Sequence, residues 1–353
     1  MTQPVVVSPG AGLADSPVAI TEICDLALID LDGVAYRGHE PIEHAAEGIA
    51  ALRDRDVTTV FVTNNASREP EEIAAQLSSL RIPTRPNEVL TAAQACARYL
   101  GEFVEPGAKV LVVGGAGLLT AVREAGYEIV TSADDGPAAV AQGFSPDLGW
   151  KDLAEAAYAV AAGAVHVASN RDLSLPTARG FAPGNGTLVQ AVSSATGIEP
   201  VSAGKPSPTM YHMAVAATGS QRTLVIGDRL DTDLAGARGG GYLGLLVLTG
   251  VSTARDAILA PPSLRPHLIV ADLSGLEEAH GAPTSDEDGR WHCQDRSAAV
   301  IDGKLQLSVT PVQGGMALVR AAAAAVWAAR DNGIEVDEGS VPEFPVGRIA
   351  QSG

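Results

Sequence analysis

The chain of 353 residues has few cysteines, few aromatic residues and a shortage of positive charge. Its three cysteines, Cys24, Cys96 and Cys293, are far apart and form no Cys-x-x-Cys pair, which argues against a disulfide scaffold and favours a reducing compartment. Only 24 lysines and arginines oppose 42 aspartates and glutamates, so the formal net charge is -18. That balance argues against a nucleic-acid or anionic-membrane partner. Any anion site must therefore be positive locally, through a metal, a lysine or a helix N-terminus.

Two further absences concern secretion and membranes. Residues 1–20 contain no Lys or Arg, which a signal peptide carries at its start, and we expect no later apolar run long enough to span a bilayer. We therefore expect a cytoplasmic protein without a membrane partner. Hydrophobic residues make up 46% of the chain, so a sizeable core is expected, and the length allows two domains or one core with a large insert.

Strand and helix signals alternate along the chain, which predicts an α/β fold with a mainly parallel sheet. The expected strands are 26–31, 58–62, 109–113, 138–141, 164–168, 223–226 and 243–247. The expected helices run from Pro41 towards Arg55, over 69–80 and over 230–238.

The composition changes near Gly281, after which 282–290 is predicted to be a polar, acidic linker. Asp302-Gly303 then predicts a hairpin between strands 297–301 and 304–309, followed by an Ala-rich helix over 316–330 and a tail of about twenty residues. The helix needs a surface to cover, either on the core or on a second subunit. This hairpin and helix resemble part of an acetyltransferase fold, but the loop that binds an acyl-CoA pyrophosphate is missing, so we infer no acetyl transfer.

Asp30 and Asp32 follow an apolar strand, and Gly33 allows a sharp turn after them. Residues i and i+2 of a strand point to the same side, so both carboxylates can face one pocket. Two like charges held that close favour a bound cation or a proton on one of them. In phosphoryl transfer one carboxylate attacks phosphorus and the other protonates the leaving oxygen. The alternative is a turn with solvated carboxylates.

Two further segments can hold a phosphoryl group. Thr63 and Asn64 end a second apolar strand, where a hydroxyl, an amide and backbone N–H groups can bind phosphoryl oxygens, although such a turn is more often a helix N-cap. Lys205 stands in Gly-Lys-Pro before a helix and can neutralise the transferring group, although a lone Lys is usually a solvated surface residue.

A fourth segment, Gly227-Asp228-Arg229-Leu230-Asp231-Thr232-Asp233, again follows an apolar strand. Asp228 is placed to bind a hard cation directly and Asp233 to support the cation or its waters. The alternative is an Asp-rich helix N-cap, and Asp231 is expected to be no more than that.

Two other patterns have plainer explanations. The sequence Gly114-Gly115-Ala116-Gly117 after a strand is similar to a dinucleotide fingerprint but lacks its third glycine, so we favour an ordinary strand-to-helix turn over NAD binding. His292 and Cys293 supply too few ligands for a metal site.

The order of the four motifs, DxDGV, hydrophobic-T-N-N, G-K-P and G-D-x-x-x-x-D, resembles the haloacid dehalogenase (HAD) superfamily of phosphatases over residues 20–280. The resemblance implies a Rossmann-like core and an aspartyl-phosphate mechanism. Asp30 would be the nucleophile, Asp32 the general acid and base, Thr63 and Asn64 phosphate ligands, and Lys205 the stabiliser. It also implies a Mg²⁺ cofactor bound by Asp30, the Asp32 backbone carbonyl and Asp228, with Asp233 in support.

The spacing of the motifs locates an insertion. Thr63 follows Asp32 by 31 residues, enough for one crossover, whereas Lys205 follows Asn64 by 141. The resemblance therefore sharpens to the NagD-like (p-nitrophenylphosphatase) group, with a C2-type α/β cap in that gap. The predicted domains are 15–86 and 196–281 for the core, 87–195 for the cap and 282–353 for a small α+β extension. Asn170, Arg171 and Asp172 resemble that group's cap segment and are candidate substrate residues, and Arg37, Arg171 and Arg229 are the charged substrate contacts we favour.

The implied function is a phosphomonoesterase acting on a small phosphorylated metabolite. Glycerol-3-phosphate is the expected substrate, with phosphoglycolate and pyridoxal phosphate as alternatives. A phosphomutase or phosphotransferase and a non-catalytic binding protein are the weaker readings. A homodimer through the cap or the C-terminal extension is also an expectation.

Overall fold

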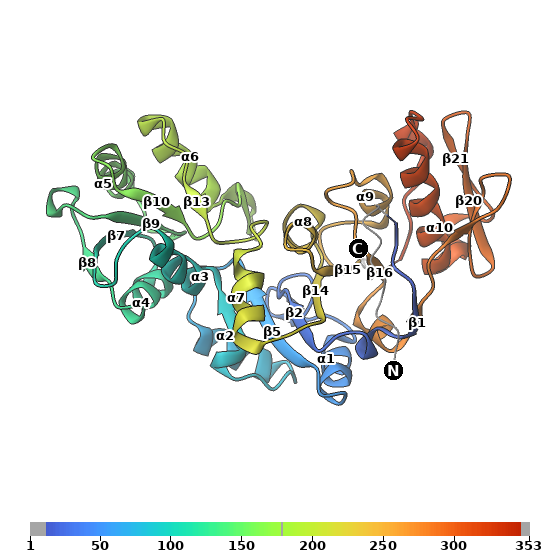
Figure 1. Ribbon diagram of the computed structural model, residues 1–353, viewed down its shortest axis with the longest axis horizontal. Helices are drawn as coiled ribbons and strands as arrows, with labels where there is room; N and C mark the ends of the chain where they lie inside the picture. Colours follow the sequence, from blue (N-terminus) through green and yellow to red (C-terminus); the bar gives the residue numbers. More distant parts are fainter. Residues whose placement is uncertain (1–11, 178, 347–353) are drawn as a thin grey trace. The chain divides into compact units, whose positions relative to one another are not determined.

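The computed structural model describes residues 12–177 and 179–346, and the chain divides into two compact units (Figure 1). The first unit holds the described residues up to Val60, Leu80–Ile82 and the residues from Val215 onward. The second unit holds Phe61–Ser79 and Pro83–Ala214. Residues 1–11, which were considered for a signal peptide, and residues 347–353 of the predicted tail lie outside the described part.

The first unit is built on a parallel sheet with the strand order β16-β15-β14-β2, followed by β5. Its strands are almost entirely apolar and buried, as expected when helices cover both faces of a parallel sheet. The strands are β2 (Leu26–Ile29), β5 (Thr58–Thr63), β14 (Thr223–Gly227), β15 (Leu243–Val247) and β16 (Leu268–Val270). The predicted strands and the α/β class are confirmed here, with shifts of one or two residues at their ends.

Shorter elements complete the core of this unit. The helices are α1 (Ala45–Arg53), the π-helical turn η5 (Leu230–Leu234), α8 (Ala235–Gly239) and α9 (Ala254–Leu259), with 3-10 turns η1 (Ile20–Glu22) and η6 (Leu273–Glu277). Two small antiparallel pairs join β1 (Ser16–Ala19) to β17 (Ala279–His280) and β3 (Tyr36–Arg37) to β4 (Glu40–Pro41). The prediction that Pro41 opens a helix is wrong, because Pro41 pairs with Tyr36 in the β3–β4 hairpin and the helix begins at Ala45.

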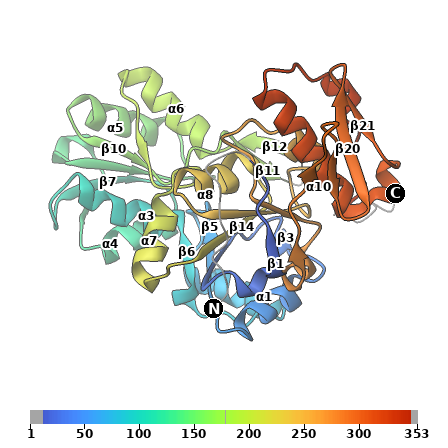
Figure 2. The same cartoon turned by 45° about the vertical axis from the view of Figure 1, so that its right-hand side comes forward.

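The second unit contains a separate five-stranded parallel sheet with the order β13-β10-β9-β7-β8. Figures 1 and 2 show α5 and α6 on one face of this sheet and α3 and α4 on the other. Its strands are β7 (Lys109–Val113), β8 (Glu128–Val130), β9 (Ala139–Gln142), β10 (Val165–Ala168) and β13 (Val201–Ser202), and its helices are α3 (Ala92–Tyr99), α4 (Ala116–Glu124), α5 (Trp150–Ala161) and α6 (Asn185–Thr196). This sheet lies in the long gap between the motifs, where the inserted α/β cap is predicted.

The second unit also contains elements outside this sheet. Strand β5 ends in this unit, where Thr63 pairs with Thr91 of the parallel strand β6 (Val89–Thr91). A hairpin of β11 (Ser174–Thr177) and β12 (Gly180–Pro183) follows Asp172. The remaining helices are α2 (Pro70–Ser79) and α7 (Thr209–Thr218), which passes into the first unit at Val215. The 3-10 turns are η2 (Pro86–Glu88), η3 (Leu100–Glu102) and η4 (Ala133–Asp135).

The C-terminal extension forms a four-stranded antiparallel sheet of β18 (Thr284–Ser285), β19 (Trp291–Cys293), β20 (Arg296–Ile301) and β21 (Lys304–Leu307). The hairpin at Asp302-Gly303 is confirmed, since Ile301 pairs with Lys304 and both turn residues have positive φ angles of 50° and 73°. The predicted linker is wrong in part, because it contains β18, which pairs with β19. The predicted helix over 316–330 is confirmed as the part of α10 (Pro311–Asp331) that follows a kink at Gly315, whose φ and ψ angles are not helical.

Helix α10 packs on the core of its own chain, beside β20 in both views (Figure 2). Its buried alanines, Leu318, Val319 and Val326 join one apolar cluster with residues of α9, β15 and β16. Val336, Val341 and Phe344 belong to the same cluster, so the described part of the predicted tail is packed rather than loose. The helix therefore covers the core of its own chain.

Among the described residues, α10 is the one helix long and apolar enough to cross a membrane by length and composition. We expected no such run, and on this count the expectation is wrong. About three quarters of its apolar window (72%) is buried inside the protein, which is the pattern of a core helix.

Candidate active site

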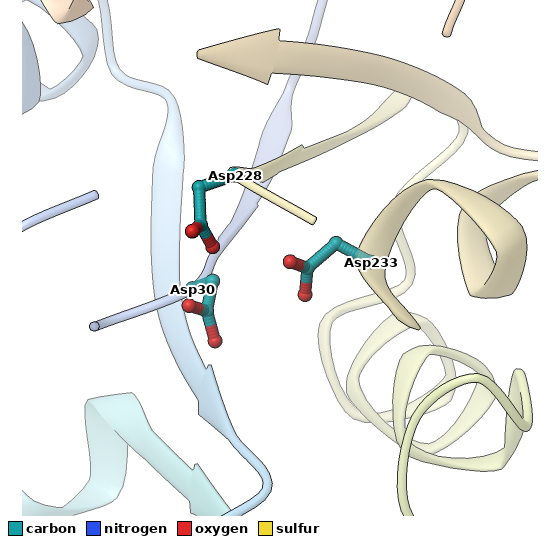
Figure 3. A group of neighbouring side chains, drawn as sticks. All are labelled: Asp30, Asp228 and Asp233. Atoms are coloured by element: carbon teal, nitrogen blue, oxygen red, sulfur yellow. The ribbon is translucent and has the colours of Figure 1, made fainter. Parts of the chain in front are cut away.

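Asp30 and Asp228 end two neighbouring strands of the first unit. Strands β2 and β14 run parallel with Ile29 opposite Ile226, and the Asp30 N–H donates to the Ile226 carbonyl at 2.9 Å. The two carboxylates therefore leave the same edge of the sheet, where ligands bind in open α/β folds. Each of Asp30, Asp228 and Asp233 offers a carboxylate oxygen, and these three oxygens lie within 4.8 Å of one another (Figure 3).

Asp233 belongs to the π-helical turn η5, which places its carboxylate in this cluster. Its carboxylate accepts the Arg229 N–H at 3.2 Å, so the side chain folds back over the start of the turn. A Cβ at Gly227 would lie 2.2 Å from the Asp233 Cβ, so only glycine allows this approach. Asp233 is 1% exposed and belongs to the protein interior.

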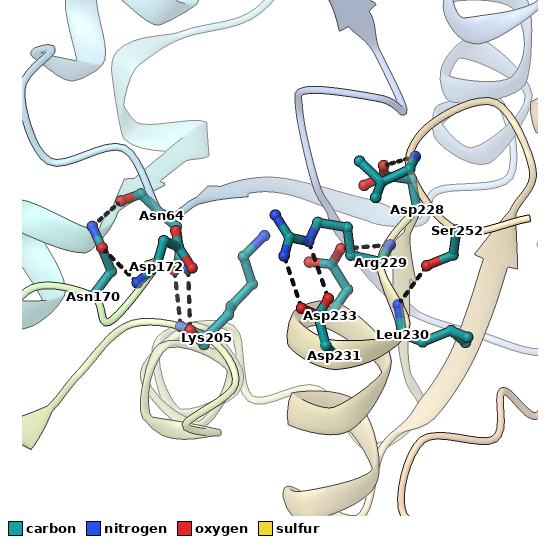
Figure 4. Close-up of polar contacts among 11 residues, drawn as sticks. Asn64, Asn170, Asp172, Lys205, Asp228, Arg229, Leu230, Asp231, Asp233 and Ser252 are labelled. Carbon is teal, nitrogen blue, oxygen red and sulfur yellow. Dashed lines mark hydrogen bonds and ion pairs between the residues drawn. The ribbon is translucent and has the colours of Figure 1, made fainter. Parts of the chain in front are cut away.

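A loop after β15 holds Asp228 in place (Figure 4). The Val251 N–H donates to the Asp228 carboxylate at 2.7 Å, and the Ser252 N–H donates to the backbone carbonyl of Asp228 at 3.0 Å. A Cβ added at Gly250 would lie 1.9 Å from the Asp228 Oδ2, and one added at Gly33 would lie 2.4 Å from the same atom. Only glycine at these two positions leaves room for the carboxylate.

Sequence reasoning missed this loop. The Ser252 hydroxyl accepts the Leu230 N–H at 3.1 Å, and the Thr249 hydroxyl donates to the Gly33 carbonyl at 2.6 Å. The available signal was a run of small residues, Thr249 to Ser252, directly after an apolar strand.

The three-carboxylate cluster fits a hard divalent cation. Asp228 and Asp233 are buried, and Asp30 is half-buried. Buried like charges at this separation are costly without a counter-charge. All donors are oxygens, which Mg²⁺ prefers, and the half-exposed Asp30 remains open to a substrate. In the described part of the chain, no other group of three or more His, Cys, Asp or Glu side chains converges in this way.

Asp32 differs from its neighbour in environment. It follows the buried Leu31, and the turn beyond it closes through the Gly33 N–H, which donates to the Tyr36 carbonyl at 2.8 Å. Gly33 has a φ of +92°, which a residue with a side chain rarely adopts. Partial burial raises the pKa of the Asp32 carboxyl, against the opposing effects of the Gly38 N–H and the Arg37 charge. The residue remains solvent-exposed as a whole, so we expect this rise to be moderated by water.

The other predicted motif residues belong to the second unit. Thr63, Asn64 and Lys205 lie there together with Asn170 and Asp172 of the predicted cap. Lys205 is 3% exposed, so it is not the solvated surface lysine of the alternative reading. Its ammonium group donates to the Val62 carbonyl at 3.3 Å, near the end of β5.

Asn64 is bound on several sides (Figure 4). Its Oδ1 accepts the Lys205 N–H at 2.9 Å, and its Nδ2 donates to the Lys205 carbonyl at 3.1 Å. The same Nδ2 donates to the Asp172 carboxylate at 3.1 and 3.3 Å, and the Asn170 Nδ2 donates to the Asn64 carbonyl at 2.8 Å. The side-chain amide predicted to bind phosphate is thus engaged with the protein.

The three arginines expected at the substrate all have protein partners. Arg37 donates to the Thr249 carbonyl, Arg171 pairs with Glu199 at 2.9 Å, and Arg229 pairs with Asp231 at 2.8 Å. Each is at least partly exposed. Their roles as substrate contacts stay predictions, and Asp231 serves as an ion-pair partner rather than as a simple cap.

The glycines of the dinucleotide-like pattern are explained by packing. Strand β7 ends at Val113, and Gly115 is the N-cap of α4. A Cβ at Gly117 would lie 3.0 Å from the Ala66 and Arg68 carbonyls. This strand-to-helix turn therefore has a structural reason for its glycine.

Comparison with known proteins shows which families and relatives the chain resembles. Residues 27–128 match the family described as haloacid dehalogenase-like hydrolase, and residues 202–276 match a HAD-hydrolase-like family. The chain is 42% identical over 88% of its length to D-glycerol 3-phosphate phosphatase of Mycobacterium tuberculosis, with 88% of that protein covered. It is 36% identical over 70% of its length to acid sugar phosphatase of Staphylococcus saprophyticus, with 94% of that protein covered.

Solved structures agree with these matches. The crystal structure of a glycerol phosphate phosphatase from M. tuberculosis in complex with magnesium aligns with a TM-score of 0.80 at 41% identity, covering 88% of this chain and 93% of that one. A double mutant of a thermostable NPPase from Geobacillus stearothermophilus aligns with a TM-score of 0.65 at 33% identity, covering 70% and 96%. The chain belongs to the haloacid dehalogenase-like hydrolases, as a phosphatase of the NagD-like group.

Proposed function

We propose that this phosphatase hydrolyses glycerol 3-phosphate to glycerol and phosphate. The observation that supports this substrate is the 42% identity to D-glycerol 3-phosphate phosphatase, which spans 88% of both chains and therefore includes at least part of the C-terminal extension. The acid sugar phosphatases match over 70% of this chain or less. The shared C-terminal extension thus favours the glycerol phosphate enzyme over the sugar phosphatases.

We assign the two steps of the reaction to Asp30 and Asp32. An Asp30 carboxylate oxygen attacks phosphorus, the bond to the leaving oxygen breaks, and the Asp32 carboxyl gives its proton to that oxygen. Asp32 then takes a proton from water, which attacks the aspartyl-phosphate and releases phosphate. The half-burial of Asp30 and the raised pKa of Asp32 support this division of roles.

The other site residues would bind the metal or offset the negative charge of the phosphoryl group. Asp30, Asp228 and the Asp32 backbone carbonyl would hold Mg²⁺, with Asp233 in support. When bound, Mg²⁺ supplies electrostatic stabilisation of the charge on the transferring phosphoryl group. Thr63 and the backbone at Asn64 would bind phosphoryl oxygens, and the Lys205 ammonium would neutralise negative charge.

A panel of phosphate esters tests the substrate. We expect kcat/KM for glycerol 3-phosphate to exceed that for phosphoglycolate, pyridoxal phosphate and sugar phosphates by at least about tenfold, which corresponds to about 1.4 kcal/mol of transition-state binding. A higher kcat/KM for any of these other esters would overturn the substrate proposal but not the phosphatase assignment. Incorporation of ¹⁸O from labelled water into phosphate separates hydrolysis from phosphotransfer to a second alcohol.

We further infer a cytoplasmic enzyme and a homodimer formed through the cap. Helix α10 of the extension is covered by its own core, while Trp150 and Tyr158 of the cap helix α5 are 76% and 58% exposed. Sedimentation of the wild-type protein and of Trp150→Ala tests the dimer. A monomer at micromolar concentration would contradict it.

A further inference from the structure

We propose that Asp172 is a positioning residue for Lys205 and acts on it through the side-chain amide of Asn64. This inference rests on the proposed phosphatase mechanism, in which Lys205 neutralises the transferring phosphoryl group. It gives Asp172, a candidate substrate residue of the predicted cap, a positioning role.

The first step is the pairing between Asn64 and the backbone of Lys205. The amide of Asn64 both accepts from the Lys205 N–H at 2.9 Å and donates to the Lys205 carbonyl at 3.1 Å. A side-chain amide that meets both backbone groups of one residue fixes the position and direction of that residue. Since Lys205 is 3% exposed, its side chain starts from this fixed backbone inside the protein.

The second step is the choice between the two orientations of the Asn64 amide. If the amide were rotated by 180°, its oxygen would face the Lys205 carbonyl and its NH₂ group would face the Lys205 N–H. The Asp172 carboxylate accepts from the Asn64 Nδ2 at 3.1 and 3.3 Å and can accept only a donor. A hydrogen bond to a charged acceptor is also stronger than one between neutral groups. Asp172 therefore selects the orientation that pairs with Lys205.

The third step is the rigidity of Asp172 itself. Its N–H donates to the Asn170 Oδ1 at 3.3 Å, and its carbonyl accepts the Gly186 N–H at 2.8 Å. The Asn170 carbonyl in turn accepts from the Asn185 Nδ2 at 2.8 Å. The segment is therefore fastened to the N-terminus of α6 by both backbone and side-chain bonds.

Close packing supports the same conclusion. A Cβ at Gly204 would lie 2.3 Å from the Ser169 carbonyl and 2.9 Å from the Asn64 Oδ1. A Cβ at Gly186 would lie 2.2 Å from the Arg171 carbonyl. Glycine at these two positions lets the cap segment, Asn64 and the Lys205 backbone approach one another within the second unit.

The test compares Asp172→Ala and Asp172→Asn on p-nitrophenyl phosphate and glycerol 3-phosphate. Asp172→Ala removes the acceptor, so we expect kcat to fall by about tenfold to 100-fold, the range for a misplaced charged group, and by the same factor for both esters. KM is expected to change less than about twofold, because Lys205 acts mainly in the transition state. Asp172→Asn keeps an acceptor oxygen and is expected to retain at least about half of kcat.

The matched control is Asp147→Ala, which removes an exposed carboxylate of the same unit. It is expected to leave kcat within about twofold of the wild type. Thermal unfolding of each variant reports whether it is folded.

The outcomes separate positioning from substrate contact. A loss confined to glycerol 3-phosphate, or one that appears as a raised KM, would overturn the proposal and make Asp172 a substrate contact. An unchanged kcat in Asp172→Ala would also overturn it. If Asp172→Ala does not fold, Asp172→Asn decides, since a tenfold loss on both esters would contradict a role that needs only an acceptor. If the wild type fails to hydrolyse glycerol 3-phosphate, the proposed substrate is wrong, and p-nitrophenyl phosphate still tests Asp172.

Discussion

At the scale of single residues, the environments of Asp30 and Asp32 assign different chemistry to two carboxylates only two positions apart. Asp30 lies in a cluster with Asp228 and Asp233 that favours its ionised form when a cation is bound. Asp32 lies outside that cluster, and the pKa of its carboxyl is raised by partial burial. A nucleophile must be ionised and an acid must carry its proton, so the two environments suit the two roles.

The pKa of Asp32 predicts a pH dependence. The protonated acid is the active form in the first step, so kcat/KM for glycerol 3-phosphate should fall as the pH rises through this raised pKa. Because the positive charge of Arg37 lowers the pKa of Asp32, Arg37→Ala should move that fall to higher pH. The pH profile of kcat/KM, measured for both proteins, checks this. A shift to lower pH would contradict the assignment of Asp32 as the acid.

The glycines around Asp228 predict a metal-binding defect. Gly250→Ala would place a Cβ 1.9 Å from the Asp228 Oδ2, so the carboxylate must move. We expect the Mg²⁺ concentration for half-maximal activity to rise by at least about tenfold, as for the loss of groups that orient a metal ligand. Gly239→Ala, where a Cβ meets nothing within 4 Å, is the matched control. Equal metal dependence in the two variants would show that Asp228 does not bind the metal.

That Asp30 and Asp228 lie close together could be predicted from the sequence, because each stands directly after a buried strand of a parallel sheet. The loop from Thr249 to Ser252 could not, since it has no charged side chain and acts through backbone N–H groups and small size. The partners of Asn64 were also missed. They come from residues 108 and 141 positions away in the sequence, and no local pattern reports such contacts.

At the scale of elements, α10 is the feature that joins the C-terminal extension to the core. Trp327 is 2% exposed and its indole N–H donates to the Ala257 carbonyl at 3.1 Å. The Arg265 guanidinium lies 5.2 Å from the centre of the Trp327 ring and pairs with Asp331 at 2.7 and 2.9 Å. The helix is thus fixed to its own chain by apolar, cation–π and ionic contacts.

This packing predicts a large effect on stability. Trp327→Ala should lower the free energy of unfolding by about 3–5 kcal/mol, the usual cost of removing a buried Trp. Val312→Ala, on the same helix but at a side chain that is 79% exposed, should change it by less than about 0.5 kcal/mol. Urea unfolding of both variants measures the difference. Similar stabilities would mean that α10 is not part of the folded core.

The elements themselves were predicted with mixed success, for physical reasons. Seven strands of the parallel sheets were found because they contain continuous, mostly buried apolar runs, whereas β6, β8, β13 and β16, each of two or three residues, were not predicted. Pro41 was misread as the start of a helix because proline is favoured both there and at an exposed edge of a short hairpin. The polar composition of 282–290 concealed β18, a two-residue strand that is exposed at a sheet edge.

At the scale of the whole molecule, the net charge of -18 opposes the approach of an anionic substrate. Salt screens this repulsion, because the Debye length falls from about 30 Å at 0.01 M to about 8 Å at 0.15 M ionic strength. We therefore expect kcat/KM for glycerol 3-phosphate to rise over this range at constant free Mg²⁺. A steady fall would mean that local positive charge at the site dominates the encounter.

The central claim is that Asp30 is the nucleophile of a phosphatase that accepts glycerol 3-phosphate. The most direct measurement is mass spectrometry of acid-quenched enzyme after mixing with glycerol 3-phosphate and Mg²⁺. We predict one phosphoryl group on the peptide that contains Asp30, its absence in Asp30→Asn, and a loss of turnover of at least about 1000-fold in that variant with unchanged thermal unfolding. A phosphoryl group on another residue, or appreciable turnover by folded Asp30→Asn, would contradict the account.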